Sequence, residues 1–383
     1  MTKTLLVVSA DREADEAAVG RGAGPRRDYL ALAEALDAAI FDFGTLRRST
    51  AGSRLIRVFG KGPAQALLAA QRAGSYDTVF TDSEHIGLFL GILLARRRSR
   101  PRHVMLAHHL TPRKKHLFAR LGRSGIDAVI VHSEAQRDFA VQRLGFEASR
   151  ISVLPYQVDT DFWRPLAVQA PPMICTMGLE CRDYATFLSA VEGLSVDVRI
   201  GAASNWSRKA NTLAGRTVPS GVEVGSYGYE ALREIYAEAC LVAVPLLDVD
   251  FQAGVTLILE AMAMAKAVVA TQTRGQAGAV QGPLWIDGTV DWPSDGPAPE
   301  QSTGIYVPPR RPDLLRDAMQ YLLERPDLAA RLGRNGRKAV VEAFTLEHFT
   351  FRFASAIDPG WNAVHRNQPA HAVPDLDAAI ASG

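Results

Sequence analysis

One segment, residues 247–271 (LDVDFQAGVTLILEAMAMAKAVVAT), combines acidic, small and hydroxyl residues in a spacing that suits phosphate and sugar chemistry. A loop with Asp248 and Asp250 leads to a small-residue turn, and a helix is predicted to open at Thr256. The free backbone N–H groups of a helix start, with the positive end of its dipole, favour an anion such as a phosphate. Glu260 lies one turn along on the same face, where a carboxylate can accept two hydrogen bonds from a ribose diol. An ordinary strand–loop–helix joint with a surface glutamate fits the same residues, and both interpretations stay open.

A glycine-rich loop, residues 19–28 (VGRGAGPRRD), follows the first predicted strand and precedes a helix. Gly22 and Gly24 would let an acceptor or a phosphate approach the backbone, with Arg26 beside them. A flexible surface turn has the same composition, so this alternative also stays open. The loop is not GxGxxG and lacks the later ribose-binding acid, which argues against a nicotinamide-dependent dehydrogenase.

Two histidines, His108 and His109, follow the predicted strand at residues 103–107 (HVMLA). Ligands of parallel sheets bind at the carboxyl ends of strands, so one of the pair is a candidate for substrate contact. The other is interpreted as structural, because a histidine is more often a satisfied polar group than a catalyst.

Eight cations lie within twenty residues, in the stretch from Arg96 to Arg102 (RRRSRPR) and at Arg113, Lys114 and Lys115. By default such a run is a solvated helix end and loop. It also suits peripheral contact with an anionic lipid surface or with a phosphorylated acceptor.

Composition limits the class of protein. The chain has 383 residues, of which 47% are hydrophobic and 22% charged, as in a globular protein of two or three domains. A formal charge of +2 argues against bulk electrostatic binding of nucleic acid. Cys175, Cys181 and Cys240 are too few and too scattered for a disulfide framework or a four-ligand zinc site. The longest apolar run, residues 86–95, is far shorter than the roughly 20 residues of a membrane span, so we expect a cytoplasmic protein.

Strands and helices are predicted to alternate along both halves of the chain. Short apolar strands are predicted at residues 4–9, 39–43, 78–81, 103–107, 128–132 and 151–154, and again at 173–177, 196–200, 222–224, 241–245, 267–271 and 304–307. Apolar strands separated by amphipathic helices predict parallel sheets covered on both faces, the doubly wound α/β class. Residues 282–301, rich in Gly, Pro and Asp, are predicted to form a surface loop.

The two halves are predicted to be separate domains. A stretch with three prolines, residues 163–172 (WRPLAVQAPP), predicts a linker between them. We expect an N-terminal domain at residues 1–165 and a second domain at 166–345. Small ligands would bind in a cleft between the carboxyl ends of the two sheets.

Four segments, in order along the chain, resemble the retaining nucleotide-sugar glycosyltransferases of family 4. Residues 252–271 are similar to the family's nucleotide-sugar signature. The other three segments are residues 131–165, 177–191 and 303–345, which resemble the end of the first domain, the opening of the second and its closing helices. The resemblance implies the GT-B fold, with two Rossmann-like domains facing each other across a cleft and residues 346–383 packing back toward the first.

The resemblance also implies a donor site, position by position. Glu260 is similar to the glutamate that holds the nucleotide ribose, whereas the family's other glutamate falls on Gln252, which brings no charge. Arg182 is similar to the basic residue that neutralises the diphosphate. The donor-binding residues implied are Gly178, Arg182, Arg208, Lys209, Gln252, Ala253, Gly254, Val255, Thr256 and Glu260.

A second departure from the family pattern is Leu179, where a basic residue is common. Arg208 or Lys209 is expected to supply the missing charge, and His109 is similar to a family histidine near the donor sugar. The catalytic residues implied are His109, Arg182, Lys209 and Gln252, and the acceptor-side residues are Gly22, Gly24, Arg26 and His108.

The resulting prediction is a bacterial, metal-independent, retaining glycosyltransferase that needs no cofactor and uses a nucleoside diphosphate sugar, with uridine favoured. Transfer would occur on one face of the sugar, and the departing phosphate would accept the acceptor's proton, because no carboxylate pair is in place for double displacement. The acceptor stays open: a small molecule or a lipid-linked intermediate of natural-product or cell-envelope synthesis. Alternatives are a nucleotide-sugar epimerase of the same fold and a non-catalytic nucleotide-sugar-binding protein.

Overall fold

A computed structural model describes residues 2–202, 213, 217–276, 279–286, 289–291 and 300–361. The chain forms two compact units, each with its own sheet and its own buried core. The first unit runs to Pro155 and takes up the chain again at Leu346, and the second runs from Tyr156 to Thr345.

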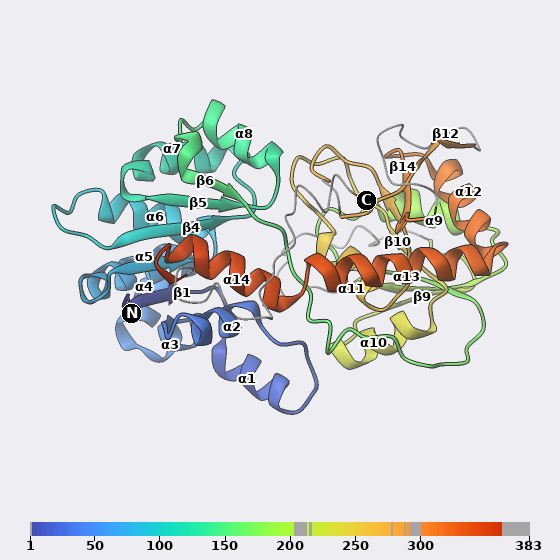
Figure 1. The fold of residues 1–383 in the computed structure, drawn as a ribbon, viewed down its shortest axis with the longest axis horizontal. Helices are drawn as coiled ribbons and strands as arrows, with labels where there is room; N and C mark the ends of the chain where they lie inside the picture. The colour runs from blue at the N-terminus through green and yellow to red at the C-terminus, as the bar shows by residue number, and fades with distance from the viewer. Residues whose placement is uncertain are drawn as a thin grey trace. The chain divides into compact units, whose positions relative to one another are not determined.

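The sheet of the first unit has six parallel strands in the order β2-β1-β3-β4-β5-β6 (Figure 1). These strands are β1 (Thr4–Val7), β2 (Ala39–Phe41), β3 (Thr78–Thr81), β4 (Arg102–Ala107), β5 (Ala128–Val131) and β6 (Ile151–Val153). All six lie at predicted positions, with ends shifted by at most two residues. Because the strands are parallel, the residues that follow β1, β3, β4 and β5 meet at one edge of the sheet.

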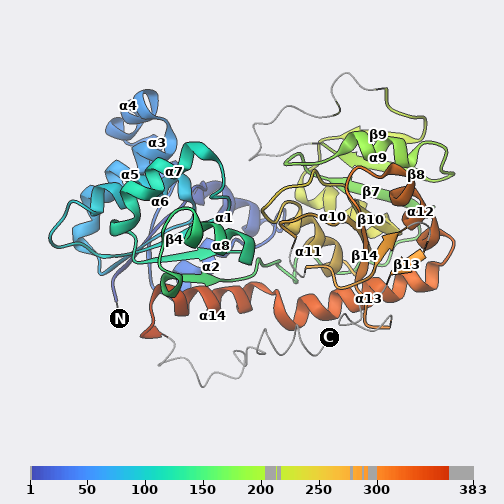
Figure 2. The same cartoon turned by 90° about the horizontal axis from the view of Figure 1, so that it is seen from above.

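Helices cover both faces of this sheet. They are α1 (Arg12–Gly20), α2 (Asp28–Ala35), α3 (Phe43–Arg48), α4 (Thr50–Phe59), α5 (Lys61–Arg72), α6 (Glu84–Leu94), α7 (Arg113–Gly122), α8 (Glu134–Gln142) and α14 (Leu346–Ile357). Side chains of β1 alternate between two cores: Leu6 packs with α2 and α14, and Leu5 packs with α5 and α6. Figure 2 shows α14 on one side of the sheet and α5, α6 and α7 on the other.

The second sheet has eight strands in the order β13-β12-β14-β11-β10-β7-β8-β9. They are β7 (Met173–Met177), β8 (Asp197–Gly201), β9 (Val222–Gly225), β10 (Leu241–Val244), β11 (Ala267–Thr271), β12 (Leu284–Ile286), β13 (Thr289–Asp291) and β14 (Gly304–Val307). All neighbours pair in parallel except β12 and β13. This antiparallel pair lies where the sequence predicted only a surface loop, since strands of three residues show little periodicity among glycines and prolines.

The helices of the second unit are α9 (Tyr184–Val191), α10 (Tyr229–Glu238), α11 (Val255–Ala263), α12 (Pro312–Leu323) and α13 (Pro326–Ala343). Alternate residues of β10 again serve two cores: Val244 packs with α10 and α11, and Ala243 packs with α9 and α12. Each core is contiguous on its face of the sheet, as expected for a doubly wound α/β unit.

The boundary between the units lies at Pro155 and Tyr156 rather than at residue 165. Phe162 and Trp163 belong to the core of the second unit, where the Trp163 ring lies 5.4 Å from that of Tyr236. The predicted linker, residues 163–172, therefore lies within the second unit rather than between the units. At the other end, α14 packs on α2, and residues 362–383 lie outside the described part of the chain.

Among the described residues, no helix has the length and apolar character that crossing a bilayer requires.

Candidate functional site

The N-terminus of α11 is shaped by Gly254, which caps the helix in the left-handed conformation at φ +79°. A Cβ atom at this position would lie 3.0 Å from side-chain carbons of Leu246 and Val244 and 3.3 Å from Nη1 of Arg182. Glycine is therefore required both by the backbone and by the space around it. The helix begins at Val255, one residue before the predicted start, and Thr256 is exposed in its first turn.

Arg182 lies directly beside this helix start and is only 6% exposed. Its Nε donates to the carbonyl of Met177 at 2.8 Å and its Nη1 to the carbonyl of Glu180 at 2.9 Å. A Cβ atom at Gly178 would lie 2.9 Å from Nη2, so glycines on both sides leave room for the guanidinium. Burial lowers the pKa of Arg182. A buried cation next to a helix N-terminus is an arrangement that attracts a diphosphate.

Glu260 lies one turn into α11, and Oε2 of its carboxylate accepts a hydrogen bond from the hydroxyl of Tyr236 at 2.9 Å. Tyr236 is fully buried, and burial followed by the Glu260 charge raises the pKa of its hydroxyl. The hydroxyl therefore stays protonated as a donor and fixes the orientation of the carboxylate. Gly178, Arg182, Gly254 and Glu260 thus lie in one part of the second unit, as predicted from the sequence.

The loop before α11 is shaped by a segment that the sequence analysis did not single out. Asp248, one of the two loop acids, forms an ion pair with Arg274, with Nε and Oδ2 3.2 Å apart. A Cβ atom at Gly275 would lie 2.2 Å from the Phe251 carbonyl oxygen, and Gln276 donates to the carbonyl of Ala253. Asp248 therefore contacts a neighbouring segment of the chain. The run Thr-Arg-Gly-Gln at residues 273–276, one residue after β11, was the available signal.

Gln252 is half-buried in this loop and follows Phe251. Arg208 and Lys209, which were expected to supply a second cation, lie outside the described residues.

The carboxyl edge of the first sheet gathers polar residues that follow four strands, β1, β3, β4 and β5. Asp82 follows β3, and its Oδ2 accepts from the backbone N–H and the hydroxyl of Ser9, at 2.6 Å and 2.8 Å. His108 follows β4; its Nε2 lies 3.0 Å from the Asp82 carbonyl oxygen and its ring 5.3 Å from that of His132. Burial raises the pKa of Asp82 to about 6 and lowers that of His132 to about 3. Sequence reasoning missed Asp82, which directly follows a predicted strand, and His132, which is the last residue of another.

A buried ion pair holds the turn that carries His108 and His109. The Nζ atom of Lys115 lies 2.6 Å from Oε1 of Glu84, and the other carboxylate oxygen accepts from the His108 N–H at 3.0 Å. Nζ also donates to the His109 carbonyl at 2.6 Å. Burial would raise the pKa of Glu84, but Lys115 and His108 hold it at about 2. The pair therefore holds the backbone N–H of His108 and the backbone carbonyl of His109.

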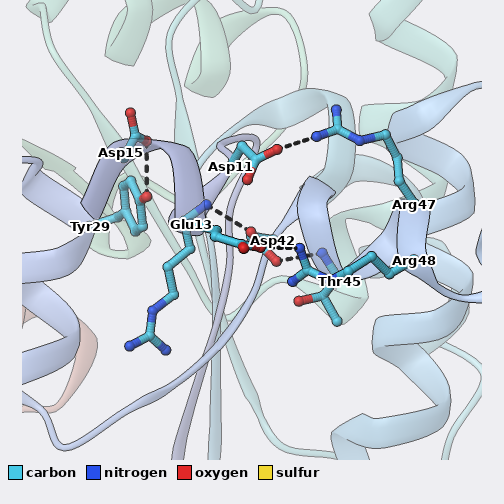
Figure 3. Close-up of polar contacts among 9 residues, drawn as sticks. Asp11, Glu13, Asp15, Tyr29, Asp42, Thr45, Arg47 and Arg48 are labelled. Carbon is cyan, nitrogen blue, oxygen red and sulfur yellow. Dashed lines mark hydrogen bonds and ion pairs between the residues drawn. The ribbon is translucent and has the colours of Figure 1, made fainter. Parts of the chain in front are cut away.

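The glycine-rich loop follows α1, a helix without a single buried residue. Polar contacts with α3 and its cap hold this helix (Figure 3). Asp42 accepts from the Arg12 N–H at 2.8 Å, and Asp11 and Glu13 pair with Arg47 and Arg48. In the loop itself, Gly22 has φ +70°, and Arg26 lies 3.0 Å from Glu347 of α14. Arg26 therefore has a structural partner, which the sequence did not predict.

The basic stretch does not act as one charged surface. Arg100 forms a bidentate pair with Asp127, with distances of 2.6 Å and 2.9 Å, and Arg102 donates to the Ala356 carbonyl at 3.4 Å. Lys115 is buried with Glu84, so the expectation that it contacts a membrane is wrong. The exposed cations of the two segments are Arg96, Arg97, Arg98, Arg113 and Lys114.

Two family models match parts of the chain. Residues 24–162 match the family described as Glycosyltransferase Family 4, and residues 188–325 match Glycosyl transferases group 1. No curated protein sequence matches the chain.

Solved structures show the same fold. Sucrose-phosphate synthase from Thermosynechococcus elongatus is 18% identical at a TM-score of 0.70, covering 94% of this chain and 100% of that one. A glycosyltransferase from Rickettsia africae is 15% identical at 0.64, covering 96% and 100%. Anabaena HepE in complex with UDP-glucose is 14% identical at 0.65, covering 94% and 100%.

Proposed function

The chain belongs to the glycosyltransferases of the GT-B fold, with a first half of family 4 and a second half of group 1, and from this premise we propose that it is a retaining enzyme that uses a nucleoside diphosphate sugar. The observation that carries the proposal is the contact between the Arg182 guanidinium and the glycine-capped start of α11, with Glu260 one turn further along.

In this proposal the diphosphate binds at the start of α11. The backbone N–H groups of Val255 and Thr256 would donate to phosphate oxygens, and Arg182 would neutralise charge from the side. Negative charge grows on the diphosphate as the bond to the sugar breaks, so these groups stabilise the transition state more than the ground state. In this proposal Arg182 takes the place that a divalent cation holds in metal-dependent enzymes. Arg208 or Lys209 would supply a second positive charge.

Glu260 would accept hydrogen bonds from the ribose diol, because Tyr236 holds its carboxylate in place. Gln252 would bind a hydroxyl of the donor sugar as a neutral partner, with Ala253 and Gly178 allowing close approach of the backbone. HepE, a structural neighbour, has been solved with UDP and with UDP-glucose, which favours a uridine donor here.

The transfer step breaks the bond between the anomeric carbon and the diphosphate oxygen and forms a bond from that carbon to an acceptor oxygen on the same face. The acceptor hydroxyl gives its proton to the departing phosphate oxygen, so atoms and charge balance without a protein nucleophile. Acceptor recognition is assigned to the first unit, at Gly22, Gly24, Arg26 and His108, with His109 acting near the sugar. The proposed acceptor is a small molecule or a lipid-linked intermediate.

The first test measures thermal unfolding with UDP, GDP, ADP and UDP-glucose, each at about 100 times its dissociation constant, where binding adds about 2.7 kcal/mol to stability. We expect one nucleotide to stabilise the wild type and the effect to be lost in Glu260→Ala. Glu324→Ala, an exposed residue at the end of α12, is the matched control and should keep the full shift.

No shift with any nucleotide in the wild type would refute the donor assignment. A shift that survives in Glu260→Ala would refute the role of that carboxylate. Selective binding without transfer to any acceptor or to water would favour the non-catalytic alternative, and a changed sugar without an acceptor would favour the epimerase.

A further inference from the structure

Helix α7 exposes two leucines on a strongly basic surface. Leu117 is 62% exposed and Leu121 is 56% exposed, and they lie one helical turn apart on the same face. The opposite face of α7 contains Lys115, Ala119 and Gly122, which are buried against α6 and its surroundings. The leucines therefore play no part in the packing of the helix.

The charged residues that α7 itself carries are all positive. Arg113, Lys114 and Arg120 are exposed on α7, and the sequence contains no Asp or Glu from residue 85 to residue 126. The acidic residues at the two ends of this interval already form ion pairs. Glu84 is buried with Lys115, and Asp127 pairs with Arg100. The exposed face of α7 thus combines apolar side chains with the helix's own positive charges, although α8, which carries Glu134 and Asp138, packs beside it through Phe139 and His116.

A neighbouring helix shows the same combination. Val58 and Phe59 of α4 are 72% and 55% exposed, and no acid occurs from residue 43 to residue 76. Helices α4, α5, α6 and α7 pack in that order against one another on one face of the first sheet (Figure 2). In the second unit, by contrast, the exposed Val341 of α13 has Glu342 beside it.

We propose that α7 is a membrane-docking helix, which lies on an anionic bilayer with Leu117 and Leu121 in the acyl boundary and with Arg113, Lys114 and Arg120 on lipid phosphates. Exposed apolar residues flanked by Lys and Arg on one helix are typical of helices that lie in the membrane interface. A soluble polyanion would use the cations and gain nothing from the leucines, so the leucines distinguish the bilayer from other anionic partners. The proposal deepens the function above, since a docked enzyme can reach a lipid-linked acceptor, but its test does not depend on donor or acceptor.

The test is co-sedimentation of the full chain with vesicles of equimolar phosphatidylglycerol and phosphatidylcholine, against vesicles of phosphatidylcholine alone. We expect binding to the anionic vesicles only, weakened by added salt. Each Leu→Ser change at positions 117 and 121 should lower the partition coefficient about tenfold, because an apolar side chain is withdrawn from the bilayer. Arg113→Glu and Lys114→Glu should each lower it by about fivefold or more.

Val341→Ser is the matched control, an exposed aliphatic residue of the second unit beside the Lys338–Glu342 ion pair, and should bind as the wild type does. Circular dichroism of each variant checks that the fold is intact, which is expected because the changed residues are exposed. Three outcomes would overturn the proposal. They are no binding of the wild type to anionic vesicles, unchanged binding of the double serine variant, and loss of binding only when Val58 and Phe59 of α4 are changed. Nucleotide-induced stabilisation of the same variants reports separately on the donor site.

Discussion

At the scale of single residues, the main observation is that one guanidinium is buried beside the start of α11. Arg182 is held by two backbone carbonyls and by the space that two glycines leave for it. Its position is therefore fixed before any ligand binds. Prearranged charge of this kind needs no reorganisation when negative charge develops on a leaving group.

Replacing this cation should weaken binding of the diphosphate and not of the nucleoside. In Arg182→Met we expect affinity for UDP to fall about tenfold to a hundredfold, the range for a lost charge-assisted hydrogen bond, while uridine affinity stays unchanged. Isothermal titration calorimetry with both ligands measures the two effects. Arg199→Met removes a cation of β8 that pairs with Glu238 of α10. This change should leave both affinities unchanged. Equal losses for UDP and uridine would show that Arg182 supports the fold of the site and does not contact phosphate.

At the scale of secondary-structure elements, the turn after β4 is held by residues from two helices. Glu84 opens α6 and Lys115 lies in the first turn of α7, and together they bind the peptide groups of His108 and His109. The pair is buried, so its two members depend on each other: either one alone would be an uncompensated charge.

Glu84→Gln should lower the free energy of unfolding by about 3 kcal/mol at pH 7. The pKa of Glu84 is about 2 in the folded chain against an ordinary 4.5, so the wild-type advantage is present above pH 4.5 and is lost as the pH falls toward 2. Denaturant unfolding of both proteins between pH 2 and 7 measures this difference. Glu324→Gln, at an exposed position, serves as control. A difference that stays constant across this pH range would contradict the assignment.

At the scale of the whole molecule, the chain leaves its first unit at Pro155 and returns to it at Leu346. The returning helix α14 buries Phe349, Phe353 and Ile357 against the core that contains α2. The rings of Phe353 and Phe80 of β3 are 6.5 Å apart, edge to face. The first unit is thus completed by residues distant in sequence.

Phe353→Ala should therefore lower the stability of the first unit by about 3–5 kcal/mol, as for other buried aromatic residues. Hydrogen exchange of the amides in β1 and β3 measures this stability separately from that of the second unit. Phe351→Ala is the matched control on the same helix, because its side chain is only partly buried. This change should lower the stability of the first unit clearly less. Faster exchange in β10 and β11 after Phe353→Ala would show that α14 is not specific to the first unit.

The resemblance to family 4 grouped Arg182, Gly254 and Glu260, and the sequence alone was sufficient to predict twelve of the fourteen strands in the described part of the chain, the doubly wound class and the helix start beside Gly254. These features depend on local patterns: an apolar run predicts a buried parallel strand, and a glycine before a helix predicts its N-terminus. Tertiary structure alone decided that Lys115 is buried with Glu84, that Arg26 pairs with Glu347 and that Leu117 and Leu121 of α7 are exposed. The sequence shows which residues are charged. Their burial and their ion-pair partners could not be predicted, because both depend on residues brought together from distant elements.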